Sequence, residues 1–264
     1  MKNTILDEII KFKLQEITER KKLFPLRELK KETLKVSACR DFRSAVFNFE
    51  EKSVSIVAEI KRFSPSRGIL RSDLDPVKMA SLYGKSGASA ISVLLDSKFF
   101  GGSLDDLKLV RDAVSLPILA KEFIIDEYQI YEAKLAGADA VLLIARILEK
   151  ENLLRLYEIA EDLGLACIVE IHTSGELSRI RSLPPSVIIG INNRNLENFK
   201  VDLGVTRSIL RFFPSSRNII SESGIKNVQD IIELKKMGVK AFLIGEAILK
   251  SKDPARKLKE FCSG

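Results

Sequence analysis

Tryptophan is absent from this chain of 264 residues, and cysteine and histidine are scarce. The three cysteines, Cys39, Cys167 and Cys262, are odd in number and far apart, which argues against a disulfide framework and against a zinc site. His172 is the only histidine, so a metal site built from several histidines is excluded. The sequence therefore predicts no metal centre.

Long apolar runs are also missing from the sequence. No stretch approaches the ~20 apolar residues of a membrane-spanning helix, and the first residues lack the apolar core of a signal peptide. We therefore expect a cytoplasmic protein without a membrane partner.

The formal net charge of +7 allows two interpretations. Nucleic-acid binding by a barrel without enzymatic activity is one of them, but lysine and arginine alternate with acidic residues and form no basic block. A small anionic substrate explains the charge at least as well. We expect no nucleic-acid partner.

Short apolar runs rich in β-branched residues occur eight times along the chain. Each run is nearly continuous and is bounded by glycine, proline or charge, which is typical of strands buried on both faces. The eight predicted strands are residues 54–60, 88–95, 117–123, 138–145, 165–171, 187–191, 218–221 and 239–244.

Amphipathic stretches of helical period separate these runs. Good examples are residues 104–114, 127–136, 149–163 and 227–237. A unit of roughly 26 residues repeated eight times predicts a (β/α)8 TIM barrel. An open doubly wound sheet is the alternative, but no G-x-G-x-x-G follows the first strand. We expect residues 1–264 to form one domain.

Residues 1–50 precede the first predicted strand and carry helical patterning of their own. Thr4 and Asp7 form a weak capping signal, and a second short helix is expected over residues 41–47. This extension is either a clamp on the barrel or a lid over its mouth, and the pattern leaves both open. The predicted apolar stripe consists of Ile5, Leu6, Ile9, Ile10, Leu14 and Ile17.

Several of the apolar runs end at a polar residue or at a glycine. Glu59 and Lys61 lie two apart at the end of the first run, so they share a face. Two charges that face an interior must pair with each other or with a charged ligand, although a surface salt bridge on an edge strand is the alternative. Other runs end in the same way, at Lys121, Glu170, Asn192, Glu222 and Gly245.

Six motifs together resemble the indole-3-glycerol phosphate synthase family. They are EIKRFSPS at 59–66, FFGGSL at 99–104, AKEFI at 120–124, VEIH at 169–172, GINNRNL at 190–196 and SESGI at 221–225. The resemblance covers essentially the whole chain, including the helical extension. It implies a TIM-barrel lyase of tryptophan biosynthesis that needs no metal and no organic cofactor.

The resemblance also assigns catalytic roles. Lys121 corresponds to the general acid of ring closure, and Glu170 to the base or proton shuttle. Lys61 would bind the substrate carboxylate or act as a second acid, and the sequence leaves open which lysine serves dehydration. A lysine that forms a Schiff base, as in aldolases, is the rival mechanism on such a barrel.

Other strand-end residues match positioning groups of the family. Glu59 and Glu222 would hold the lysines and a substrate hydroxyl, although simple ion-pair partners are the alternative. Asn192 and Arg194 correspond to an Asn-x-Arg motif whose guanidinium suits a carboxylate, and Ser223 would hydrogen-bond substrate hydroxyls.

Apolar walls and a phosphate site complete the expected substrate pocket. Apolar side chains would surround the anthranilate ring, unless they are plain core: Phe100, Phe123, Leu142 and Leu196. Phosphate would bind in the loops after strands seven and eight, at Gly224, Gly245 and Glu246. Ser64 would contact the phosphate from a third direction.

Two further expectations concern Glu246 and His172. We expect the Glu246 carboxylate to point away from the phosphate, and His172 to influence the site indirectly at most. The partner would be a phosphorylated small molecule, and the chain a monomer, with a dimer as the alternative.

Overall fold

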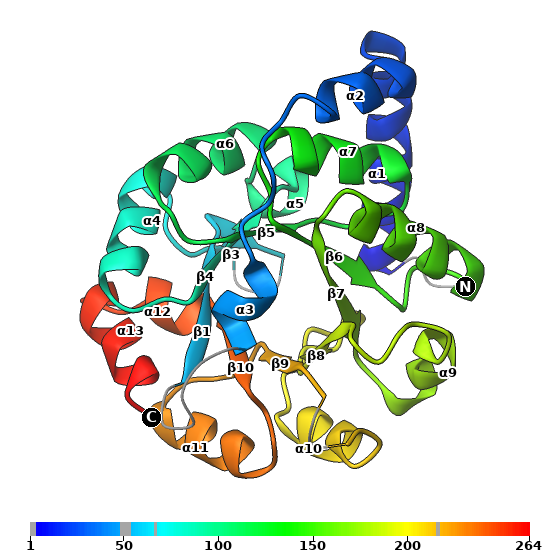
Figure 1. The fold of residues 1–264 in the computed structure, drawn as a ribbon. Helices are drawn as coiled ribbons and strands as arrows, with labels where there is room; N and C mark the ends of the chain where they lie inside the picture. The colour runs from blue at the N-terminus through cyan, green and yellow to red at the C-terminus, as the bar shows by residue number, and fades with distance from the viewer. Residues whose placement is uncertain (1–3, 48–53, 66–67, 215–216) are drawn as a thin grey trace.

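The computed structural model describes residues 4–47, 54–65, 68–214 and 217–264. Eight parallel strands pair side by side and close into a barrel, which Figure 1 views along its axis. The open doubly wound alternative is therefore wrong. The barrel strands are β1 (Ser55–Ile60), β4 (Ala90–Leu94), β5 (Ile118–Lys121), β6 (Ala140–Ile144), β7 (Ala166–Ile171), β8 (Ile188–Asn192), β9 (Ile219–Glu222) and β10 (Ala241–Ile244).

All eight strands expected from the sequence are confirmed. Nearly every residue of these strands is buried, because side chains alternate between the barrel interior and the surrounding helices. A short hairpin of β2 (Phe63–Ser64) and β3 (Gly68–Ile69) follows β1. Residue 66, the last of the motif at 59–66, lies outside the described residues, as does residue 67.

Helices surround the barrel as an outer layer (Figure 1). The four helices predicted at 104–114, 127–136, 149–163 and 227–237 are confirmed within two residues at each end. The helices after β1 are α4 (Pro76–Lys85), α5 (Ser97–Phe100), α6 (Leu104–Ala113), α7 (Glu127–Leu135), α8 (Lys150–Asp162), η1 (Ser174–Glu176), α9 (Leu177–Ile180), α10 (Gly204–Leu210), α11 (Val228–Lys236), α12 (Glu246–Leu249) and α13 (Pro254–Cys262).

The N-terminal extension contains three helices: α1 (Ile5–Leu23), α2 (Leu26–Thr33) and α3 (Phe42–Phe47). Thr4 and Asp7 form a reciprocal capping box at the start of α1, as predicted. The sequence analysis did not predict α2, whose backbone begins directly after Pro25.

The apolar stripe predicted for α1 is wrong at one position. Leu14 is 56% exposed, whereas Lys13 is fully buried and lies between the buried residues Ile9 and Ile17. The spacing 9, 13, 17 follows the i, i+4 periodicity of one helix face, and a lysine occupies its centre. The physical reason is a set of buried carboxylates that pair with this ammonium, described below.

The short helix α3 closes the amino-terminal end of the barrel. Its Phe42 and Val46 are buried and belong to the same apolar cluster as the inward-facing Val57, Ala90 and Leu119. Figure 1 shows α3 in front of the barrel strands. The polar residues lie at the opposite end of the barrel, where the strands have their carboxyl ends.

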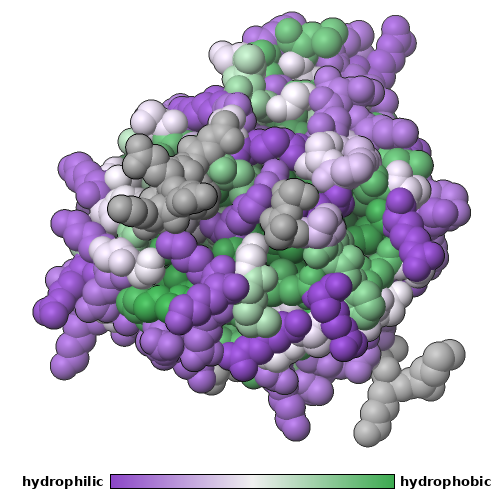
Figure 2. Space-filling model, turned by 60° about the horizontal axis from the view of Figure 1, so that its bottom comes forward, coloured by the Kyte–Doolittle hydropathy of each residue, from purple (hydrophilic) through white to green (hydrophobic). Residues whose placement is uncertain are grey.

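The outer surface is mainly hydrophilic on the face that Figure 2 shows, and hydrophobic side chains emerge between the polar ones in patches. Large exposed apolar side chains on the extension include Leu23 and Leu34. No helix in the described ranges is long and apolar enough to cross a membrane.

Candidate active site

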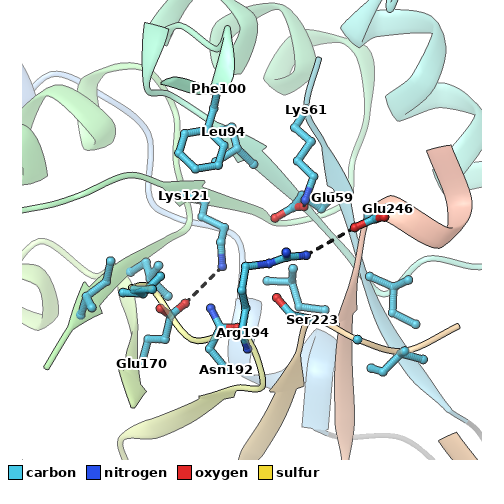
Figure 3. Close-up of a pocket in the computed structure, with 18 of the residues that line it drawn as sticks. Glu59, Lys61, Leu94, Phe100, Lys121, Glu170, Asn192, Arg194, Ser223 and Glu246 are labelled. Atoms are coloured by element: carbon cyan, nitrogen blue, oxygen red, sulfur yellow. Dashed lines mark hydrogen bonds and ion pairs between the residues drawn. The ribbon is translucent and has the colours of Figure 1, made fainter. Parts of the chain in front are cut away.

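A cavity opens at the carboxyl ends of the barrel strands, where the predicted residues gather (Figure 3). This is the end at which TIM-barrel enzymes carry their active sites. Residues predicted from the sequence that line the cavity are Glu59, Lys61, Phe100, Lys121, Phe123, Leu142, Glu170, Asn192, Arg194, Leu196, Ser223, Gly224, Gly245 and Glu246.

Lys121, the last residue of β5, occupies the centre of the charged residues. Its Nζ lies 2.5 Å from Glu222 Oε2 and 3.4 Å from Glu170 Oε2. Burial opposes the cationic form, but the nearby carboxylates of Glu222, Glu170 and Glu59 outweigh it and raise the pKa of Lys121 above its usual value. Lys121 is therefore an ammonium that faces the cavity.

Glu59 and Lys61 form an ion pair at the end of β1. Burial disfavours the charged form of Glu59, yet the cations of Lys61 and Lys121 outweigh it and lower the pKa of Glu59. Because β1 pairs with β10 on one side and β4 on the other, the edge-strand alternative is excluded.

Glu170 and Glu222 are two buried carboxylates that both pair with Lys121. The pKa of Glu170 is lowered and that of Glu222 is raised. Burial opposes ionisation of Glu170, but Lys121 and His172 outweigh it and lower its pKa. Burial raises the pKa of Glu222 to about 7, against the attraction of Lys121. Gly190, on the strand between them, leaves room for Glu222, because a Cβ there would collide with the Glu222 carboxylate.

The Asn-x-Arg motif turns the chain at the end of β8. The Oδ1 of Asn192 accepts a hydrogen bond from the backbone N–H of Arg194 at 3.0 Å. The guanidinium of Arg194 lies 3.3 Å from Glu246 Oε2, and Figure 3 shows the two side chains pointing toward each other. Glu246 also pairs with Lys250 at 2.9 Å. Glu246 was expected to point away from the phosphate; in the structure it lines the cavity and pairs with Arg194 and Lys250.

Apolar side chains form one wall of the cavity. The rings of Phe100 and Phe123 have centroids 5.9 Å apart, and Leu142 and Leu196 line the same space. The sequence analysis missed four further apolar lining residues from strand ends, namely Leu94, Ile144, Leu243 and Ile244.

A tight turn after β9 places Ser223 and Gly224 at the cavity. Ser223 and Gly224 both have left-handed backbones, with φ of 63° and 88°. Asn193 stabilises this turn, since its Nδ2 donates to the carbonyl oxygens of Glu222 and Ser223 at 3.0 Å. A non-glycine residue held in this conformation is typical of functional sites.

Gly245 and Ser64 have neighbours that the sequence did not predict. A Cβ on Gly245 would lie 2.5 Å from Glu59 Oε1, so glycine at this position makes room for Glu59. Ser64 lines an adjoining pocket, together with Ile5, Leu6 and Ile9 of α1. Lys61 lines both this pocket and the main cavity.

The N-terminal extension thus acts at both ends of the barrel. While α3 closes the amino end, α1 places apolar side chains beside the catalytic mouth. Lys13 of α1 also reaches the loops after β4 and β5, where its Nζ lies 3.0 Å from Asp96 and 2.9 Å from Glu122. Sequence reasoning missed Lys13, although a lysine at the i, i+4 spacing of two buried isoleucines is a signal of a buried ion pair.

His172 shares a strand face with Glu170 and was expected to influence the site indirectly at most. Its imidazole lies 3.1 Å from Glu170 Oε1, and the residue does not line the cavity. Its contact with Glu176 was not predicted.

Comparison with known proteins decides the family. A family model described as indole-3-glycerol phosphate synthase matches residues 6–261 of the chain. The chain belongs to this family. The indole-3-glycerol phosphate synthase of Prochlorococcus marinus (strain MED4) is 45% identical over 261 residues, covering 97% of this chain and 88% of that protein. The same enzyme of Alkaliphilus metalliredigens is 41% identical, covering 98% of each chain.

Two solved structures that match are more distant in sequence and support the fold alone. A 3-hexulose-6-phosphate synthase has a TM-score of 0.62 at 18% identity, covering 79% of this chain and 98% of that chain. A thiamine phosphate pyrophosphorylase from Pyrococcus furiosus has a TM-score of 0.56 at 17% identity, covering 80% and 94%.

Indole-3-glycerol phosphate synthases are lyases of tryptophan biosynthesis, and this chain is one of them. They convert 1-(2-carboxyphenylamino)-1-deoxyribulose 5-phosphate to indole-3-glycerol phosphate, releasing carbon dioxide and water. The substrate is thus a phosphorylated small molecule. Within the described part of the chain, no group of three or more His, Cys, Asp or Glu side chains is placed to hold a metal ion.

Proposed function

We propose that this indole-3-glycerol phosphate synthase uses Lys121 as the general acid of ring closure and Glu170 as the base of dehydration. The observation that carries the proposal is the position of the Lys121 ammonium in the cavity, between the carboxylates of Glu170 and Glu222. Three carboxylates keep this ammonium charged, so a proton is available where the reaction needs one.

Ring closure places negative charge on a ketone oxygen. An aromatic carbon of the substrate attacks the ribulose ketone, and the oxygen must receive a proton as the new bond forms. Lys121 donates this proton in the proposed mechanism, and its positive charge stabilises the developing oxyanion. Glu222, at 2.5 Å, holds the ammonium in place.

Decarboxylation and dehydration then complete the indole. After carbon dioxide leaves, the new hydroxyl takes a proton from Lys61 or Lys121 and departs as water while the nitrogen loses a proton. Glu170 accepts that proton, because its lowered pKa keeps it ionised at neutral pH. A proton shift from the adjacent ring CH2 to the nitrogen then gives the indole. Lys61 faces the same cavity and binds the substrate carboxylate until carbon dioxide is released, with Glu59 holding its ammonium.

The anthranilate ring packs against the apolar wall, between Phe100 and Phe123 on one side and Leu142 and Leu196 on the other. Asn192 and Ser223 bind substrate hydroxyls. Arg194 adds a planar cation at the rim, which suits a carboxylate.

The phosphate binds against the turn at Gly224 and the backbone N–H groups that begin α12 at Gly245 and Glu246. A groove beside this turn is lined by Lys226 and Lys250, whose charge favours a dianion. Ser64 lies in the adjoining pocket and contacts the substrate from the β1 side.

Trapping with borohydride tests the proposal against the Schiff-base alternative. If Lys121 acts as an acid, reduction in the presence of substrate leaves the chain unmodified by mass spectrometry. A reduced adduct on Lys121 would show that it acts as a nucleophile instead.

The enzyme is a cytoplasmic monomer in this proposal. The three cysteines are unpaired, which suits a reducing compartment. Sedimentation at micromolar concentration and cell fractionation test the two statements. A dimer, or recovery outside the cytoplasmic fraction, would contradict the corresponding one.

A further inference from the structure

His172 is the only histidine of the chain and faces the barrel interior directly after β7. Its side chain is 2% exposed, and its Nε2 lies 3.1 Å from Glu170 Oε1 in an ion pair. Figure 3 shows the Glu170 carboxylate reaching from the strand toward Lys121. Glu170 therefore has a cation on each side, with Lys121 at the cavity and His172 behind it.

The opposite edge of the imidazole faces a second acid. Glu176 Oε2 lies 3.6 Å from His172 Nδ1 and also accepts a hydrogen bond from the His172 backbone N–H at 2.7 Å. Arg146 is 3.9 Å from the other oxygen of Glu176, and the Thr173 hydroxyl is 3.4 Å from it. The buried imidazole is thus held between two carboxylates, only one of which lines the cavity.

This arrangement distinguishes Glu170 from Glu222. Lys121 alone would favour ionisation of Glu222, because its Nζ is 2.5 Å from Glu222 and 3.4 Å from Glu170. The pKa values show the opposite order, with that of Glu222 raised by burial to about 7 and that of Glu170 lowered. The second cation beside Glu170 and a hydrogen bond from Asn192 both favour ionisation of Glu170, in addition to Lys121.

His172 is charged in this environment. Burial opposes the imidazolium, but Glu170 and Glu176 outweigh burial and raise the pKa of His172 to about 9. The charge on His172 is therefore present throughout the neutral range.

We propose that His172 is a positioning residue that keeps the negative charge of the carboxylate pair on Glu170, so that Glu170 and not Glu222 receives the proton from the substrate nitrogen. The inference rests on the proposed role of Glu170 as base. Only a proton moves in this step, from nitrogen to the Glu170 carboxylate, and His172 stabilises that carboxylate before the transfer.

A single imidazole makes the ionisation of His172 directly measurable. The protein, labelled with 13C-histidine and freed of any affinity tag, gives one imidazole signal in an NMR titration from pH 5 to 10. We expect a pKa near 9 in the wild type and a lower one in Glu170→Gln. A wild-type value near 6.5 that does not move in Glu170→Gln would overturn the proposal.

The pH profile tests the effect on the base. His172→Gln retains an N–H donor but carries no charge, so the acidic limb of kcat/KM should move upward by about one pH unit or more. Cys167→Ala is the matched control, since it removes a buried side chain from the outward face of the same strand. An acidic limb at the wild-type position in His172→Gln would overturn the proposal, and a limb that moves equally in Cys167→Ala would do so as well.

A double variant separates this inference from the proposed function. If His172 acts through Glu170, then adding His172→Gln to Glu170→Gln causes no further loss of kcat. If the double variant loses kcat by the product of the two single-variant factors, the inference is overturned. Wild-type kcat in Glu170→Gln alone would overturn the base role of Glu170, whereas the NMR titration would still report on the ion pair.

Discussion

The Lys13 ammonium of the N-terminal helix lies 2.9 Å from the Glu122 carboxylate, and Glu122 is the next residue after Lys121. The same ammonium is 3.0 Å from Asp96, which follows β4, and 2.8 Å from Glu16. A buried cation in the extension thus ties together the ends of two barrel strands. This contact makes the extension a clamp, while the apolar side chains at the start of α1 border the mouth.

Replacing Lys13 with methionine should destabilise the protein by about 3–5 kcal/mol, because the buried carboxylates of Glu122 and Asp96 would lose their counter-charge. Urea unfolding of the variant measures the change. Lys11→Met is the control on an exposed position of the same helix and should change the free energy of unfolding by less than about 0.5 kcal/mol. Equal stabilities of the two variants would exclude the clamp.

Glu170→Gln should lower kcat far more than it changes KM, because the amide keeps the shape of the carboxylate and loses its basicity. Steady-state kinetics at saturating substrate measure both constants. If KM rises while kcat is unchanged, Glu170 binds the substrate and does not act as the base.

Gly245→Ala should impair catalysis as well as phosphate binding. The added Cβ would lie 2.5 Å from Glu59 Oε1, so Glu59 must shift and its pairing with Lys61 must change. We expect a lower kcat together with weaker competitive inhibition by inorganic phosphate. A variant with weaker phosphate inhibition and wild-type kcat would show that Gly245 serves the phosphate alone.

The ionisation of His172 should appear in the stability of the fold. Because its pKa is raised from 6.5 to about 9, the imidazolium stabilises the folded state fully below pH 6.5, and this contribution is lost as the pH rises through 9. Its upper bound is about 3 kcal/mol. The free energy of unfolding of His172→Gln should therefore approach that of the wild type between pH 6.5 and 9. Parallel pH curves for the two proteins would contradict the raised pKa.

The strands and most cavity residues could be predicted because both follow from local patterns. A buried parallel strand has a continuous apolar run, and the first polar side chain after it marks the carboxyl end of the barrel. Glu59, Lys121 and Glu170 were found in this way, and the structure brings them to one cavity.

Contacts between distant segments could not be predicted in the same way. Lys13 is 109 residues from Glu122, so the amphipathic pattern alone favoured Leu14 as the buried position. The space beside Gly245 is taken by Glu59, which lies on the adjacent strand at the point where the barrel closes. Likewise, the direction of Glu246 depends on Arg194, which reaches it from another loop.

The most direct test is the rate of indole-3-glycerol phosphate formation by wild type and Lys121→Ala in the presence of a chelator. We expect full activity of the wild type, and a rate lower by a factor on the order of 10²–10⁴ in Lys121→Ala. Circular dichroism should show that the variant is folded, and Lys236→Ala on the exposed face of α11 should retain the wild-type rate. A Lys121→Ala rate within about tenfold of the wild type would contradict the role of Lys121 as the acid of ring closure.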